Sequence, residues 1–137
     1  MKRRETLGGM GPVLLFDGEC GFCTCTVGWL RVLDGKRLID TVPYQRPGAP
    51  ESIGATAAEC AASIQWRGAD GTRLVGAAAV NAALAVALGS PWPLRLYHYS
   101  AATQERLYRW IATHRGRLPG ITPWCVRYPK NCGQPVR

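Results

Sequence analysis

Two cysteines separated by two residues, Cys20 and Cys23, have the types and spacing that most directly suggest chemistry in this chain. If Cys20 begins a helix, the unpaired N–H groups of the first turn and the positive end of the helix dipole stabilise its thiolate. Cys23 then lies one turn later on the same face, within reach of a disulfide with Cys20. The spacing therefore predicts thiol–disulfide exchange, with Cys20 as the nucleophile and Cys23 as the resolving thiol.

Two neighbours of this pair bear on its chemistry. Asp17, three residues before Cys20, fits two roles: a proton carrier for Cys23 during exchange, or a side chain that caps the turn or the helix. An anion beside Cys20 opposes formation of the thiolate, so we expect Asp17 to point away from that sulfur. Gly21 has no side chain, and we expect it to leave the approach to Cys20 open.

The elements around the pair follow from the hydrophobic pattern. The apolar run Val13–Phe16 predicts a strand buried on both faces. Apolar residues at helical spacing predict a helix over 20–33 that stops at Asp34, and residues 38–42 predict a second strand. These three elements make a βαβ unit with parallel strands, and the cysteine pair lies at its first strand-to-helix junction.

The rest of the chain predicts a hairpin and further helices. The expected elements, in chain order, are a loop over 46–54, a short helix capped by Thr56, a hairpin turning at 69–71, a helix ending at Gly89, and two helices separated at Ser100. From Gly116 on, four prolines predict mostly irregular chain. A set of aromatic residues is expected to pack the C-terminal helices onto the sheet: Trp92, Tyr97, Tyr99, Tyr108, Trp110 and Trp124. The predicted fold class is α/β: a thioredoxin-like βαβ unit plus β-hairpin sheet with additional C-terminal helices.

The stretch from Phe16 to Cys23, Phe-Asp-Gly-Glu-Cys-Gly-Phe-Cys, resembles the signature of the DCC family of thiol–disulfide oxidoreductases, named for its Asp-x-x-Cys-x-x-Cys pattern. The similarity continues through Val27, Trp29, Leu30 and Asp34, and it is fainter in 76–80 and in 107–112 followed by His114-Arg115. The resemblance implies a thioredoxin-like fold and an activity of the disulfide-reductase type. Thioredoxin-like proteins place a cis-proline just before the third strand, and this chain has no proline there.

The other four cysteines allow several readings. Cys25 lies about 200° round the helix from Cys23, so packing in the core is its expected role, and Cys60 is expected to be a small buried apolar residue. Cys125 and Cys132 fit three alternatives: a disulfide with each other, two free thiols, or a four-thiolate zinc site with Cys20 and Cys23. That zinc site would make the protein a zinc or interaction module, which is the alternative to a redox enzyme.

Length and composition set the wider expectations. A chain of 137 residues with 47% hydrophobic and 19% charged residues fits one globular domain, expected over 12–137 after a flexible tail over 1–11. Six cysteines are too few for a disulfide scaffold, and no apolar run is long enough to span a membrane. Since the basic N-terminus is followed by glycines rather than an apolar segment, we expect a cytoplasmic protein.

The expected partners follow from dithiol chemistry. We expect a substrate that is a disulfide-containing protein or a small thiol compound, an external electron donor, no bound cofactor or metal, a monomer, and no membrane. The net charge of +8, from 17 Lys and Arg against 9 Asp and Glu, also allows a nonspecific binder of acidic partners or nucleic acid. Solvated helix faces explain the same arginines, so nucleic acid is not an expected partner.

Overall fold

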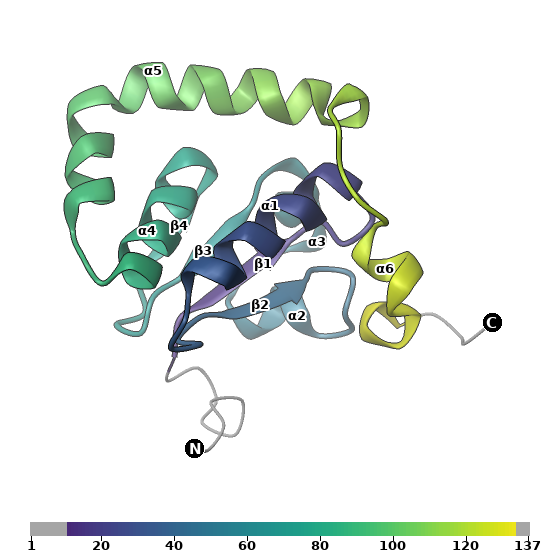
Figure 1. Cartoon of the computed structure of the whole chain (residues 1–137). Helices are drawn as coiled ribbons and strands as arrows, with labels where there is room; N and C mark the ends of the chain where they lie inside the picture. The colour runs from purple at the N-terminus through teal and green to yellow at the C-terminus, as the bar shows by residue number, and fades with distance from the viewer. Residues whose placement is uncertain (1–10, 134–137) are drawn as a thin grey trace.

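The computed structural model describes residues 11–133, and its centre is a four-stranded mixed sheet (Figure 1). The strands are β1 (Val13–Phe16), β2 (Asp40–Pro43), β3 (Gln65–Arg67) and β4 (Arg73–Val75), in the order β2-β1-β3-β4. β1 pairs parallel with β2 and antiparallel with β3, and β3 pairs antiparallel with β4. This is the predicted βαβ unit followed by a hairpin, and the thioredoxin-like α/β class is confirmed.

Helices cover both faces of the sheet. They are α1 (Gly21–Leu33), α2 (Ala49–Ser52), α3 (Ala57–Ala62), α4 (Gly76–Leu88), α5 (Trp92–His114) and α6 (Trp124–Arg127), with short 3-10 turns η2 (Arg115–Arg117) and η3 (Pro129–Cys132). In the part of the chain that the structure describes, none of these helices combines the length and the apolar character needed to cross a membrane.

β1 is buried because both neighbouring strands and both helical layers cover it. Leu14 faces the layer of α1 and α4, where it packs with Leu30, Trp66 and alanines of α4. Leu15 faces the opposite layer, where it packs with Ala49, Ile53, Ala55 and Cys60. Successive residues of a strand point to opposite faces, which is why a continuous apolar run occupies this position.

The end of α1 is fixed by Asp34, which is 5% exposed. Its backbone N–H donates to Leu30 O at 2.8 Å, and its two carboxylate oxygens accept from the N–H groups of Leu38 (3.0 Å) and Ile39 (2.9 Å). These bonds turn the chain from the helix into β2. The predicted helix stop at Asp34 is therefore confirmed.

α5 is the main addition to the sheet, and it bends at Ser100, whose φ of −129° and ψ of 26° are not helical. Figure 1 shows its longer second segment running over α4 towards the start of α1 and the cysteine motif. Tyr108 and Gln104 make two of the hydrogen bonds that attach this segment. The Tyr108 hydroxyl accepts from Ile64 N at 2.9 Å, and Gln104 Oε1 accepts from Asn81 Nδ2 at 2.7 Å. The predicted boundary between two helices at Ser100 is therefore present as a bend within one helix.

Other predictions differ in detail. The loop expected over 46–54 contains α2, and β2 begins two residues later than expected and includes Pro43. The helix cap at Thr56 is confirmed as a capping box with Glu59.

The prediction that the C-terminal aromatic residues pack helices onto the sheet is wrong for three of them. The side chains of Trp92, Tyr99 and Trp110 are more than half exposed. The predicted tail over 1–11 lies outside the described residues except for Gly11.

The contacts of Asp34 give a stability prediction. Asp34→Ala should lower the free energy of unfolding by about 2 kcal/mol. The substitution removes the carboxylate that accepts from the N–H groups of Leu38 and Ile39, and the bond to Ile39 is buried. Urea denaturation measures this loss. Asp70→Ala is the control, since Asp70 accepts from Thr72 N in a turn that is exposed to solvent. Equal losses in the two variants would contradict the prediction.

Candidate active site

Cys20 is the N-cap of α1, with an extended backbone at φ −107° and ψ 119°. Its Sγ accepts a hydrogen bond from Cys23 N at 3.2 Å, and its carbonyl oxygen accepts from Thr24 N at 3.0 Å. The sulfur therefore takes one of the N–H groups that have no partner within the helix. This is the position at the strand-to-helix junction that the spacing predicts, where negative charge is stabilised by the helix N-terminus.

The Cys23 thiol is partly buried. Burial, together with the hydrogen bond and the charge of Cys20, raises the pKa of Cys23 to about 12, although Arg115 acts in the opposite direction. Cys23 therefore keeps its proton at neutral pH. A protonated inner thiol next to a sulfur at a helix N-terminus is the asymmetry that a nucleophile and a resolving thiol require.

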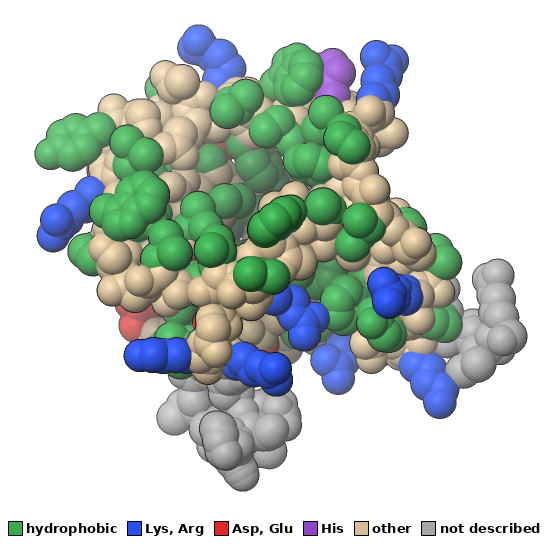
Figure 2. Space-filling view, viewed as in Figure 1, with side chains coloured by type: hydrophobic (Ala, Val, Ile, Leu, Met, Phe, Trp, Pro, Cys, Tyr) green, Lys and Arg blue, Asp and Glu red, His purple; other side chains and the backbone are tan. Residues whose placement is uncertain are grey.

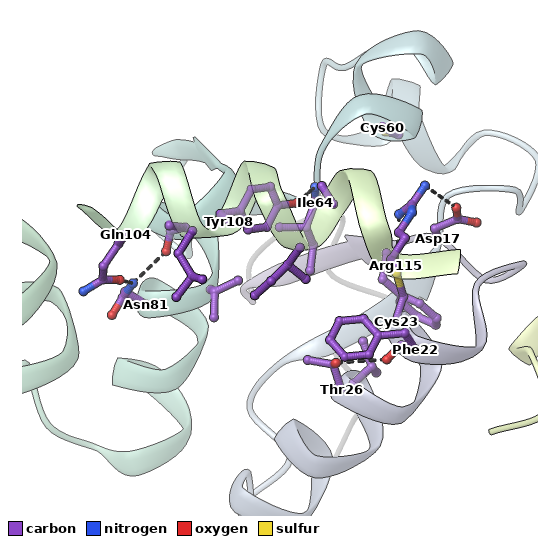
Figure 3. Close-up of a pocket in the computed structure, with 17 residues that line it drawn as sticks. Asp17, Phe22, Cys23, Thr26, Cys60, Ile64, Asn81, Gln104, Tyr108 and Arg115 are labelled. Atoms are coloured by element: carbon purple, nitrogen blue, oxygen red, sulfur yellow. Dashed lines mark hydrogen bonds and ion pairs between the residues drawn. The ribbon is translucent and has the colours of Figure 1, made fainter. Parts of the chain in front are cut away.

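Arg115, in the turn η2 after α5, joins the cysteine pair to Asp17. Its Nη1 donates to Cys23 Sγ at 3.4 Å, and its Nη2 lies 2.9 Å from Asp17 Oδ2. Figure 3 shows the guanidinium between the carboxylate and the sulfur. Ninety-two positions separate Arg115 from Cys23, so spacing could not reveal this contact. The one available signal was the His114-Arg115 pair in the faint family resemblance.

Asp17 forms the turn that leads from β1 into the motif. Its Oδ1 accepts from Glu19 N at 3.0 Å and from Gln45 Nε2 at 2.8 Å, while Gln45 Oε1 accepts from Gly18 N at 3.0 Å. The structure therefore contains the turn-forming contacts that were one of the two roles considered for Asp17. Gln45, which sequence reasoning missed, holds this turn through both its amide atoms.

The segment after α5 lies against the motif. Ile121 N donates to Gly21 O at 3.2 Å, and a Cβ on Gly21 would come within 2.5 Å of Ile121 O. Gly120 also makes a close backbone approach to Gly21 and Phe22. The expectation that Gly21 leaves the approach to Cys20 open is therefore corrected, because its missing side chain gives room to the protein's own backbone.

The remaining cysteines divide into a disulfide and two free thiols. Cys125 and Cys132 form a disulfide, so they are not available to a four-thiolate zinc site with Cys20 and Cys23. Within residues 11–133, no three or more His, Cys, Asp or Glu side chains come together as a metal-binding group. Cys60 is 4% exposed, as predicted, whereas Cys25 is only half-buried and does not belong to the core.

The chain before β3 also uses its backbone groups internally. Ile64 N donates to the Tyr108 hydroxyl, and Ile64 O accepts from Gly76 N at 3.2 Å. Thioredoxin-like proteins have their cis-proline at this position, whereas no peptide bond of the described chain is cis. α5 and the start of α4 thus occupy the backbone groups of this segment.

The mixed sheet and the cysteine pair at the start of α1 define a thioredoxin-like α/β protein with a dithiol at a helix N-terminus. Within this class, the chain belongs to the DCC1-like thiol-disulfide oxidoreductase family, whose profile matches residues 14–121. The match confirms the resemblance seen in the Asp17–Cys23 stretch and supports a thiol–disulfide oxidoreductase role. No curated protein and no solved structure shows a significant match to the chain.

The contact between Arg115 and Cys23 gives a prediction about acidity. Arg115→Met should raise the pKa of Cys23 further, because the thiolate loses a nearby positive charge and a hydrogen-bond donor. Alkylation of Cys23 at a given pH, followed by mass spectrometry in a Cys20→Ser background, should slow several-fold.

Arg117→Met is the matched control, since Arg117 is an exposed arginine in the same turn. The same pH dependence of Cys23 alkylation in both variants would show that Arg115 does not act on this thiol.

Proposed function

We propose that this protein is a disulfide reductase that works through the Cys20–Cys23 dithiol. The observation that supports this most directly is the position of Cys20 Sγ at the N-cap of α1, with a hydrogen bond from Cys23 N. Membership in the DCC1-like family supports the same chemistry. The reductase direction is part of this proposal: as free thiols, Cys20 and Cys23 can supply two electrons to a substrate disulfide.

The proposed reaction has two exchange steps. The Cys20 thiolate attacks one sulfur of the substrate disulfide, so that a Cys20–substrate disulfide forms and the first substrate thiolate leaves. Cys23 then loses its proton and attacks Cys20 Sγ, which releases the second substrate thiolate. The substrate gains two electrons and the protein ends as the Cys20–Cys23 disulfide, which an external thiol donor must reduce again.

Arg115 and Asp17 support the second step in this proposal. The guanidinium stabilises the Cys23 thiolate as it forms, and the Asp17 carboxylate holds the guanidinium in place. Because an arginine does not give up its proton, the guanidinium between Asp17 and Cys23 favours a positioning role for Asp17 over a direct proton carrier. We therefore place Cys20 and Cys23 at the chemistry, with Asp17 positioning Arg115.

The wider proposal concerns the setting of this reaction. We propose that one domain over 12–137 acts as a cytoplasmic monomer on a disulfide-containing protein or a small disulfide. The electrons come from an outside reductant, and the dithiol needs no bound cofactor. These points rest on the sequence and on the nature of dithiol exchange.

The two-step scheme predicts which variant is trapped. Cys23→Ser should accumulate a covalent Cys20–substrate disulfide, because the resolving thiol is absent, whereas Cys20→Ser should form none. Mass spectrometry under non-reducing conditions, with a small model disulfide, detects the adduct and its site. Cys25→Ser is the control and should turn over like the unmodified protein.

Two results would contradict the scheme. One is an adduct on Cys25 or Cys60 instead of Cys20. The other is a stoichiometric metal in the purified protein whose removal alone makes Cys20 and Cys23 reactive.

The two roles of Asp17 give different results in a double-mutant comparison. If Asp17 positions Arg115, Asp17→Asn should slow the resolving step several-fold, because Arg115 loses its ion pair, but should cost nothing further in an Arg115→Met background. A proton carrier would instead slow the step in both backgrounds. Single-turnover release of substrate thiol distinguishes the two, and an equal loss in both backgrounds would overturn the positioning role.

A further inference from the structure

A cavity of about 330 Å³ lies beside the cysteine pair, between α1, α4 and the second segment of α5. Figure 2 shows the hollow on this face, surrounded by hydrophobic side chains. Its walls come from three elements, with Phe22 and Val27 on α1, Val80 on α4, and Leu107, Ile111 and Ala112 on α5. The cavity is therefore a product of α5, which the four-stranded sheet alone would not form.

The redox site forms one end of this cavity. Cys23, Asp17 and Arg115 all line it, and Figure 3 shows them together at that end. At the other end, the amides of Asn81 and Gln104 are bonded to each other. The charged and polar groups are thus already paired, and the wall between them is apolar. Such a surface gains free energy by taking an apolar group out of water.

Backbone groups near the cysteine motif that could hold a substrate chain are hydrogen-bonded within the protein itself. Ile121 pairs with Gly21, and Ile64 uses both its N–H and its C=O within the fold. An extended substrate chain therefore meets a Gly21 carbonyl and two Ile64 backbone groups that are already bonded within the protein. The cavity beside Cys23 remains as the surface that can hold part of a substrate next to the reacting sulfurs.

We propose that this cavity is a specificity site, which binds a large apolar side chain next to the disulfide-bonded cysteine of a peptide or protein substrate. A volume of about 330 Å³ stands at the lower end of the range for small-molecule sites, roughly 300–1,000 Å³, which suits one side chain better than a whole cofactor. The inference rests on the proposed function, since it names the substrate class of the same dithiol.

The test compares two tripeptides whose cysteine carries thionitrobenzoate as a mixed disulfide. One has phenylalanine on both sides of the cysteine and the other has glycine, so the coloured leaving group is the same. Cys20 attacks the peptide sulfur and releases thionitrobenzoate, and Cys23 then releases the peptide thiol. The protein is reduced beforehand and the reductant is removed, so that each molecule reacts once. We expect the second-order rate constant for release of thionitrobenzoate to be at least tenfold higher for the phenylalanine peptide, because its side chain is buried in the cavity.

Substitutions in the cavity test whether it causes the preference for the phenylalanine peptide. Ala112→Phe fills the cavity and Leu107→Gln makes its rim polar, and each should bring the ratio of the two second-order rate constants close to one. The controls are the same changes elsewhere on α5: Ala102→Phe and Leu96→Gln, at exposed residues that do not line the cavity. Both controls should keep the ratio of the unmodified protein. Circular dichroism verifies that each variant is folded.

Three outcomes separate this inference from the proposed function. Equal rates for the two peptides, or a preference that survives both cavity variants, would overturn the specificity site and leave the reductase standing. Binding is measured separately by fluorescence anisotropy, with labelled S-methylated forms of both peptides and the Cys20→Ser/Cys23→Ser variant. Preferential binding of the phenylalanine form that Ala112→Phe abolishes, without any release of thionitrobenzoate by the unmodified protein, would keep the site and refute the reductase.

Discussion

The contact of the Arg115 guanidinium with both Cys23 Sγ and Asp17 Oδ2 is the interaction on which the rest of the site depends. It connects the end of α5 with the turn that follows β1. Because the three groups are partly removed from water, their attraction is stronger than between exposed charges. The same contact lowers the pKa of the inner thiol against the larger effect of burial, and its three residues line one end of the cavity. The position of α5 and the chemistry of the motif are therefore coupled.

Much of the core fold could be predicted because its signals are local. The run Val13–Phe16, the helical spacing after Cys20 and the turn at 69–71 each specify an element from adjacent residues, and together they specify a βαβ unit and a hairpin. The position of Cys20 as N-cap follows from the same junction. These features need only the strand and helix periods and the residues that end them.

The partners of the cysteines could not be predicted in the same way. Arg115 and Gln45 reach the motif only after the chain has folded, and their positions depend on the bend at Ser100 and on the chain after β2. The exposed Trp92, Tyr99 and Trp110 show the same difficulty, since their hydrophobic character alone favoured a buried position. Tertiary contacts decide which side of α5 faces the sheet.

The burial of the second cysteine pair has a consequence for how the protein handles electrons. Cys125 and Cys132 are 2% and 6% exposed, whereas Cys20 and Cys23 are partly open to solvent. An attacking thiolate must reach a disulfide sulfur, so the bond between Cys125 and Cys132 can exchange only when the C-terminal segment moves away. If Cys20 and Cys23 are also oxidised, reducing both disulfides takes four electrons. Only the two electrons taken up by Cys20 and Cys23 enter at a pair that is open to solvent. In the proposed reaction the molecule is therefore a two-electron carrier, and the buried Cys125–Cys132 couple stays out of equilibrium with the surrounding thiols on the timescale of turnover.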